Sequence, residues 1–245
     1  MQNQTATKYV AHRGFRDFRG LIENTIPAFE FAAKSDCWGI ETDVHVTADG
    51  EFVVFHDDNT LRLCGESHII EETNFDIIEN LKINGEHKIP TMNEFVKICK
   101  DGGKNAVIEL KNSMTPEQIA KLVGRVRDVG CLNDTTFISF DLDNVLILRK
   151  VLPQQDIQFL AINYPKKEVL EMLAEKKIDL DIEHLCLSQG RISQCHKLGI
   201  KVNCWTVNSE KLAKDYENWG IDFITSDNMG AELRKETVQE DALEI

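Results

Sequence analysis

Two carboxylates lie two residues apart in the segment 39–58, within a stretch that has the composition of a buried strand. Glu41 and Asp43 alternate there with the apolar residues Ile40 and Val44. Because the side chains of a strand point alternately to opposite faces, both acids project from the same face. Like charges on one buried face repel each other and lose hydration unless a cation compensates them. The spacing therefore predicts a pair of acids that binds a cation.

Other chemically reactive side chains follow short apolar segments elsewhere in the chain. Each segment has the length of a strand, and the reactive group stands at its end or just beyond it. If the segments are parallel strands of one barrel, their carboxyl ends meet at a single mouth. The residues are His12 and Arg13 after 9–11, His56 after 52–55, Glu109 and Lys111 within 107–111, and Trp205 at the end of 202–205.

The acids and the basic side chains in this set suit the binding of a phosphate ester. Glu41, Asp43 and Glu109 form an oxygen-rich group of ligands for one hard divalent cation, Mg²⁺ or Ca²⁺. Arg13 can bind phosphoryl oxygens as a planar fork, and Lys111 can bind them as a point charge. The cation and these two residues would neutralise the charge of the phosphoryl group.

The two histidines supply proton transfer near neutral pH. One of His12 and His56 can take a proton from the attacking oxygen, while the other protonates the leaving alkoxide. Asp57 is expected either to orient His56 or to hold its loop. Trp205 is expected to form an apolar wall for the substrate or to pack at the rim of the barrel.

Several other residues receive a structural interpretation. Asp179, Asp181 and Glu183 also alternate along a strand, but apart from His184 on the opposite face no histidine or lysine joins them at its end, so we expect a solvated or edge face. Phe140 is expected in the core. Residues 23–24 are expected to hold the first loop and the start of its helix.

The elements that must position these groups repeat along the chain as a short strand, a loop, an amphipathic helix and a glycine. Gly39, Gly199 and Gly220 each precede an isoleucine that begins a strand, at the place where a helix must end. About eight such units predict a closed (β/α)8 TIM barrel. An open doubly wound sheet is the rival, but no Gly-x-Gly-x-x-Gly follows the first strand.

Two regions interrupt this repeat without dividing the chain into domains. The chain is therefore expected to form one domain, and the interruptions are an insertion after the second strand and a terminal tail. The predicted limits are 1–245 for the domain, about 8–235 for its core, 59–90 for the insertion with a short helix near 75–81, 229–235 for the last helix and 236–245 for a frayed tail.

Composition narrows the partners and the location. A net charge of −13 argues against nucleic acid and against docking on an anionic membrane. No apolar segment approaches membrane-spanning length, so we expect no stable membrane insertion. Residues 1–8 are polar and predict no signal peptide, and the seven cysteines contain no Cys-x-x-Cys pair, so we expect a cytoplasmic location. The sequence leaves open whether the chain forms a homo-oligomer.

The order and spacing of the motifs resemble those of the glycerophosphodiester phosphodiesterase family, from about residue 8 to 235. The resemblance implies a TIM barrel that cleaves small-molecule glycerophosphodiesters to glycerol 3-phosphate and an alcohol. It also implies a divalent metal on Glu41, Asp43 and Glu109, acid–base catalysis by His12 and His56, and a phosphate near Arg13 and Lys111. The motifs are His12-Arg13-Gly14, Glu23-Asn24-Thr25, Glu41-Thr42-Asp43, Thr47-Ala48-Asp49-Gly50, His56-Asp57, Ile89-Pro90-Thr91, Ile108-Glu109-Leu110-Lys111, Trp205-Thr206-Val207-Asn208 and Thr225-Ser226-Asp227.

The chain departs from the family pattern at three places, none of which removes a proposed ligand. Ile22 replaces the usual proline before Glu-Asn-Thr, and segments 62–65 and 228–229 also differ. Because 62–65 lies in the insertion, substrate preference stays open. The rivals are a lysophospholipase D-type enzyme, a lyase that stops at a cyclic phosphate, and a catalytically silent barrel that binds a phosphorylated metabolite.

Overall fold

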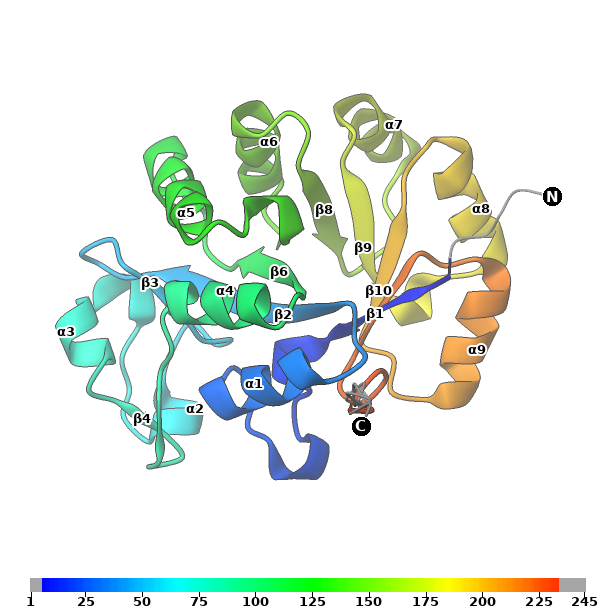
Figure 1. The fold of residues 1–245 in the computed structure, drawn as a ribbon. Coiled ribbons are helices and arrows are strands. Elements are labelled where there is room, and N and C mark those ends of the chain that lie inside the picture. Colours follow the sequence, from blue (N-terminus) through cyan, green and yellow to red (C-terminus); the bar gives the residue numbers. More distant parts are fainter. Residues whose placement is uncertain (1–5, 234–245) are drawn as a thin grey trace, which may run out of the picture.

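Eight parallel strands close into a barrel in the computed structural model, which describes residues 6–233 (Figure 1). Each barrel strand pairs with the next one along the chain, and the last pairs with the first. These pairings confirm the predicted (β/α)8 fold. The barrel strands are β1 (Lys8–Ala11), β2 (Gly39–Val46), β6 (Asn105–Leu110), β7 (Thr135–Ser139), β8 (Asp156–Ala161), β9 (Asp179–Glu183), β10 (Val202–Trp205) and β11 (Phe223–Ser226).

Helices cover the outside of the barrel, and α5 shows how the sequence starts and ends them. The side chain of Thr115 accepts a hydrogen bond from the backbone N–H of Gln118, whose own side chain accepts one from the N–H of Thr115. Pro116 occupies the first turn, and Gly130 ends the helix at a φ of 78°. The outer helices are α1 (Ile26–Lys34), α4 (Met92–Asp101), α5 (Pro116–Val129), α6 (Leu142–Val151), α7 (Lys167–Lys176), α8 (Gln189–Lys197) and α9 (Glu210–Trp219).

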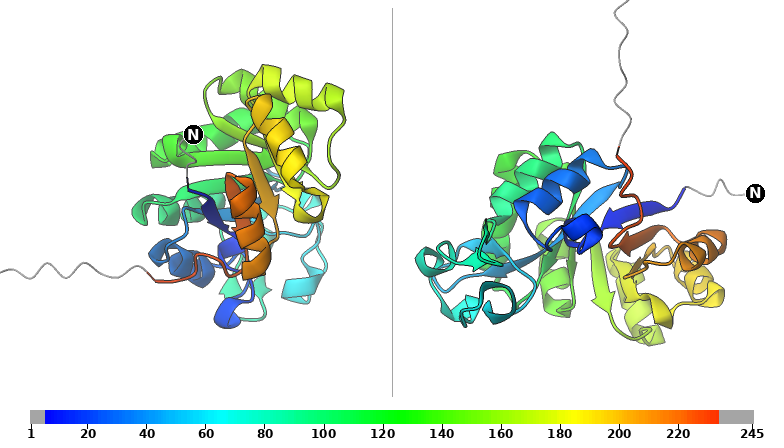
Figure 2. Two further views of the ribbon diagram at one scale, coloured as in Figure 1. Left: turned by 90° about the vertical axis from the view of Figure 1, so that its right-hand side faces the viewer. Right: turned by 90° about the horizontal axis from the view of Figure 1, so that it is seen from below.

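The insertion follows β3 (Phe52–Val54), a short strand that pairs antiparallel with β2. It projects from the side of the barrel opposite to α8 and α9 (Figure 2). Its residues bury an apolar cluster of their own, which includes Ile70 and Ile78 and also Phe55. The insertion contains α2 (Leu61–Cys64), η3 (Ile70–Glu72), α3 (Phe75–Ile78), β4 (Lys82–Ile83) and β5 (His87–Lys88), so the short helix expected near 75–81 is confirmed.

Apolar side chains fill the barrel below its mouth. Val10, Val107, Ile138 and Leu160, from four different strands, are buried against one another. Since side chains alternate along a strand, Glu109 lies two residues above Val107 on the same inward face. The apolar layer therefore forms the floor on which the polar residues of the mouth stand.

The chain after β11 differs from the prediction. Residues 229–233 form a turn followed by an isolated bridge between Leu233 and Ser35, so the helix predicted near 229–235 is wrong over this part. Gly230 adopts a φ of 80°, which a right-handed helix cannot accommodate. The tail predicted for 236–245 lies outside the described residues. Within residues 6–233, no helix combines the length and the apolar character that crossing a membrane requires.

Candidate active site

Three carboxylates from two neighbouring strands converge at the mouth of the barrel. Glu41 and Asp43 come from β2, and Glu109 comes from β6, where it is the register partner of Asp43. One oxygen from each lies within 4.8 Å of the others, and all three residues are buried. Burial, together with the negative charge of Asp43, raises the pKa of Glu41 well above its ordinary value and that of Glu109 to about 7. The acids therefore repel one another as the sequence predicted.

Two basic side chains lie among these acids. Arg13 Nε is 3.2 Å from Asp43 Oδ2, and Lys111 Nζ is 3.0 Å from Glu109 Oε1 and 3.3 Å from Asp43 Oδ1. Burial alone would raise the pKa of the Asp43 carboxyl group, but the positive charges of Arg13 and Lys111 outweigh this effect and lower the pKa. For Lys111 too, the nearby carboxylates outweigh burial and raise its pKa. Both basic groups are thus held charged beside the acids.

The donor set fits a hard divalent cation. It consists of carboxylate oxygens, which Mg²⁺ and Ca²⁺ prefer over nitrogen or sulfur. Within the described part of the chain, Oδ1 of Asp43 is buried and accepts no hydrogen bond, although it faces Lys111. A cation among the three carboxylates would offset both the burial and the mutual repulsion that raise the pKa of Glu41 and of Glu109.

Each of the two histidines is held by a carboxylate on the same ring nitrogen. His12 Nδ1 lies 2.7 Å from Asp227 Oδ1, and His56 Nδ1 lies 2.6 Å from Asp57 Oδ1. Because a carboxylate only accepts hydrogen bonds, Nδ1 carries a proton, and in a neutral ring Nε2 then keeps its lone pair. Both histidines line the same pocket. The arrangement is suited to proton transfer by two oriented imidazoles.

Sequence reasoning did not find the role of Asp227. Ala11 is the register partner of Ser226, so the residues that follow them, His12 and Asp227, leave adjacent strands at the same height. Asn208 donates a 2.7 Å hydrogen bond to Asp227 Oδ2 and accepts one from the Asp227 N–H, which fixes the carboxylate. Only the pairing of the last strand with the first could reveal this contact. Asn208 is therefore engaged with Asp227, and the neighbouring Ser209 caps the helix α9.

Glu23 and Asn24 hold the loop after β1, as expected, and they also connect it to the acids of the site. Asn24 donates a 2.7 Å hydrogen bond to Asp43 Oδ2 and accepts one from Thr42. Glu23 accepts hydrogen bonds from Arg13 at 3.1 Å and from Arg62 at 2.6 Å. These contacts hold Arg13 against the acids.

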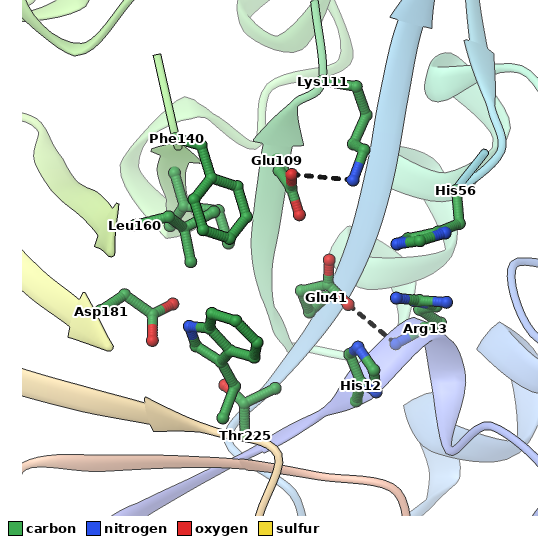
Figure 3. Close-up of a pocket in the computed structure, with 12 residues that line it drawn as sticks. His12, Arg13, Glu41, His56, Glu109, Lys111, Phe140, Leu160, Asp181 and Thr225 are labelled. Carbon is green, nitrogen blue, oxygen red and sulfur yellow. Dashed lines mark hydrogen bonds and ion pairs between the residues drawn. The ribbon is translucent and has the colours of Figure 1, made fainter. Parts of the chain in front are cut away.

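An apolar wall faces the acids and the histidines across a cavity of about 180 Å³ (Figure 3). The wall consists of Ile138, Phe140, Leu160 and Trp205, and the rings of Phe140 and Trp205 meet edge to face at 5.7 Å. Trp205 therefore lines the cavity, and its contact with substrate stays a prediction. The prediction of Phe140 as a core residue is wrong, because it follows the end of β7 at the mouth and is 42% exposed.

The solvated face predicted for the acids of β9 is wrong for Asp181. This residue is 1% exposed and lines the pocket beside the apolar wall, whereas Asp179 and Glu183 are partly exposed. The alternation of acids gave the correct shared face, but it could not show that this face points into the barrel.

Comparisons with known proteins agree with this geometry. Residues 12–231 match the model of the glycerophosphoryl diester phosphodiesterase family. A glycerophosphodiester phosphodiesterase of Bacillus altitudinis is 26% identical over 90% of this chain and 94% of its own. A human lysophospholipase D is 24% identical over 90% of this chain and 83% of its own.

Solved structures with the same fold are also similar over most of their length. An Oleispira antarctica phosphodiesterase in complex with the product sn-glycerol-3-phosphate has a TM-score of 0.83 and 25% identity, covering 91% of this chain and 93% of that one. A glycerophosphodiester phosphodiesterase from Parabacteroides distasonis has a TM-score of 0.79 and 29% identity, covering 92% and 94%.

Proposed function

The chain belongs to the glycerophosphoryl diester phosphodiesterase family and is a phosphodiesterase hydrolase, and on this premise we propose how its own residues cleave glycerophosphodiesters. The proposed products are glycerol 3-phosphate and an alcohol, and the proposed cofactor is one divalent cation. The observation that carries the proposal is the convergence of three buried carboxylates with two carboxylate-held histidines around one cavity.

Glu41, Asp43 and Glu109 would hold the cation, Mg²⁺ or Ca²⁺. Bound there, a cation supplies neutralisation of the charge on the phosphoryl oxygens. Arg13 and Lys111 line the same cavity as the acids, so they can bind the remaining phosphoryl oxygens. Ion pairs with Asp43 and Glu109 fix the positions of these two basic side chains before substrate arrives, so they are pre-oriented.

His12 and His56 perform the proton transfers in this proposal. One Nε2 takes the proton of the attacking oxygen, and the other imidazole, in its protonated form, gives a proton to the leaving alkoxide. Asp227 and Asp57 stabilise the positive charge that forms on the two rings, as the acid of a serine protease triad does for its histidine. Such acid–base catalysis contributes about 10²- to 10⁴-fold.

Product analysis tests the proposed function. The wild-type protein, incubated with glycerophosphocholine and Mg²⁺ or Ca²⁺, is expected to give glycerol 3-phosphate in the phosphorus NMR spectrum. Chelator or Glu41→Ala should abolish turnover, and His87→Ala, in the insertion away from the pocket, should retain it. A Glu41→Ala protein that is fully active in chelator would contradict the role of the cation.

A second candidate, lysophospholipase D-type activity, is favoured by an apolar lip at the mouth. Phe140, Ile162 and Leu185 are 42%, 61% and 79% exposed and follow three consecutive strands, β7, β8 and β9. A lip of this kind can hold an acyl chain beside the cavity. Leu185→Ser tests this candidate. The candidate is supported if the variant cleaves lysophosphatidylcholine at least fivefold more slowly than the wild-type protein but cleaves glycerophosphocholine at the same rate. If Leu185→Ser and the wild-type protein cleaved each substrate at equal rates, this candidate would be removed.

A further inference from the structure

The polar residue Asp181 lies inside the pocket, on the side away from the proposed phosphate-binding groups. It comes from the middle of β9, where its register partners are Leu160 and Asn203. Figure 3 shows it beside the apolar wall, across the cavity from Arg13 and His56. The proposed chemistry of the metal, the histidines and the basic residues makes no use of it.

Neighbouring side chains fix one oxygen of this carboxyl group. Asn203 donates hydrogen bonds of 3.2 Å to Asp181 Oδ2 and to Gln158, and its own carbonyl accepts one from Thr225. Because both ends of the Asn203 amide are engaged, the amide cannot rotate away from Asp181. The orientation of the carboxyl group is therefore set before any ligand arrives.

The other oxygen of this carboxyl group has no partner in the described protein. Oδ1 of Asp181 is buried, and none of residues 6–233 forms a hydrogen bond with it. A buried polar atom without a partner is rare in native proteins, and at a cavity wall its partner is commonly a ligand or water. Burial, with a smaller effect of the charge of Glu109, raises the pKa of Asp181 well above its ordinary value. A hydroxyl group can donate a hydrogen bond to a carboxyl oxygen in either protonation state, and it can also accept one when the carboxyl group is protonated.

The size of the cavity indicates which part of the substrate reaches Asp181. Its volume of about 180 Å³ is below the roughly 300–1,000 Å³ of pockets that enclose drug-sized ligands. Only a compact arm of the diester can lie inside, and the glycerol arm, which all glycerophosphodiesters share, is compact and carries hydroxyl groups. The variable alcohol would then extend through the mouth.

We propose that Asp181 is a specificity-determining residue that binds a hydroxyl group of the glycerol arm through Oδ1. This inference rests on the proposed function, since it assumes that the phosphate lies at the acids and basic groups opposite. A ligand without hydroxyl groups leaves the carboxyl group unpaired, so the site discriminates against it.

Binding of two product analogues tests the inference. Dissociation constants for sn-glycerol 3-phosphate and for n-propyl phosphate, which lacks both hydroxyls, are measured by calorimetry with Mg²⁺ or Ca²⁺ present. Asp181→Leu is expected to weaken glycerol 3-phosphate about tenfold, which corresponds to ~1.4 kcal/mol, and to leave n-propyl phosphate unchanged. Asp181→Asn, which keeps a donor and an acceptor, should retain most of the preference for glycerol 3-phosphate. If Asp181→Leu does not fold, Asp181→Ala makes the same comparison.

Asp179→Asn is the matched control, because Asp179 lies on the same strand and face but outside the pocket. It should leave both affinities unchanged. An equal loss of affinity for the two ligands in Asp181→Leu, or no loss, would overturn the inference. It would also be overturned if Asp181→Leu bound glycerol 3-phosphate normally but glycerophosphocholine more weakly, because the lost contact would then be to the choline arm. If the wild-type protein neither bound glycerol 3-phosphate nor released it from a diester, the proposed function itself would fail.

Discussion

Replacement of Asp227 by asparagine tests the catalytic geometry most directly, because the structure determines what the new amide must do. The Asn208 carbonyl accepts hydrogen bonds from the Asp227 N–H and from Ser226, so the Asn208 amide group must point at Asp227 Oδ2. In Asp227→Asn, one orientation of the new amide places two NH2 groups against each other. The other orientation points its NH2 group at His12 Nδ1 and forces the proton of the ring onto Nε2.

The first orientation sets two amide groups in repulsion and displaces the group that holds His12, whereas the second moves the ring proton of His12 to Nε2. Burial alone would raise the pKa of Asp227, but its contacts with His12 and Asn208 outweigh burial and lower the pKa. The 2.7 Å hydrogen bond between Asp227 and His12 is therefore charge-assisted. Such bonds contribute about 1.5–3 kcal/mol, or roughly 10- to 150-fold in rate, and the wrong tautomer adds to this. We therefore expect kcat to fall at least about 100-fold, with KM changed less than about threefold.

The assay is steady-state release of glycerol 3-phosphate, with thermal unfolding as the folding check. Asp222→Asn is the matched control, because Asp222 holds His196 at the same 2.7 Å distance on the outside of the barrel. It should keep kcat within about twofold. The reasoning is refuted if Asp227→Asn retains half of the wild-type kcat, or if the two variants lose activity equally.

Three further predictions concern pH, the first loop and the metal. Burial is the main cause that lowers the pKa of His56 below 6.5, so the limb of the kcat/KM profile that His56 controls should lie below pH 6.5. A limb above pH 6.5 that is absent in His56→Ala would contradict this. Gly14 has a φ of 78°, and a Cβ there would lie 2.9 Å from the Cβ of Ala28. Gly14→Ala should therefore reduce the free energy of unfolding, measured in urea, by about 2–4 kcal/mol. Gly20 has a φ of 81° but open space around it, so Gly20→Ala should reduce the free energy of unfolding by only about 1 kcal/mol. Mg²⁺ or Ca²⁺ should raise the Tm of the wild-type protein but not that of Glu41→Ala, and an equal rise in both would place the cation elsewhere.

The sequence by itself determined the local features of this protein. The two-residue spacing of Glu41 and Asp43, and again of Glu109 and Lys111, sets each pair on one face of a strand, since the alternation of strand side chains is a local property. The proline and capping residues that begin α5, and the glycine that ends it, are equally local. The recurrence of these signals was enough to predict the barrel.

Only the tertiary structure decided which faces meet. His12 and Asp227 are 215 positions apart and touch because β11 pairs with β1 when the barrel closes. Asp181 shows the same limit, since alternation placed it with Asp179 but could not show that its side chain enters a closed barrel instead of facing solvent. Periodicity reports direction relative to one strand, whereas burial and contact depend on where all eight strands lie, and that is settled only when the apolar layer packs and the sheet closes.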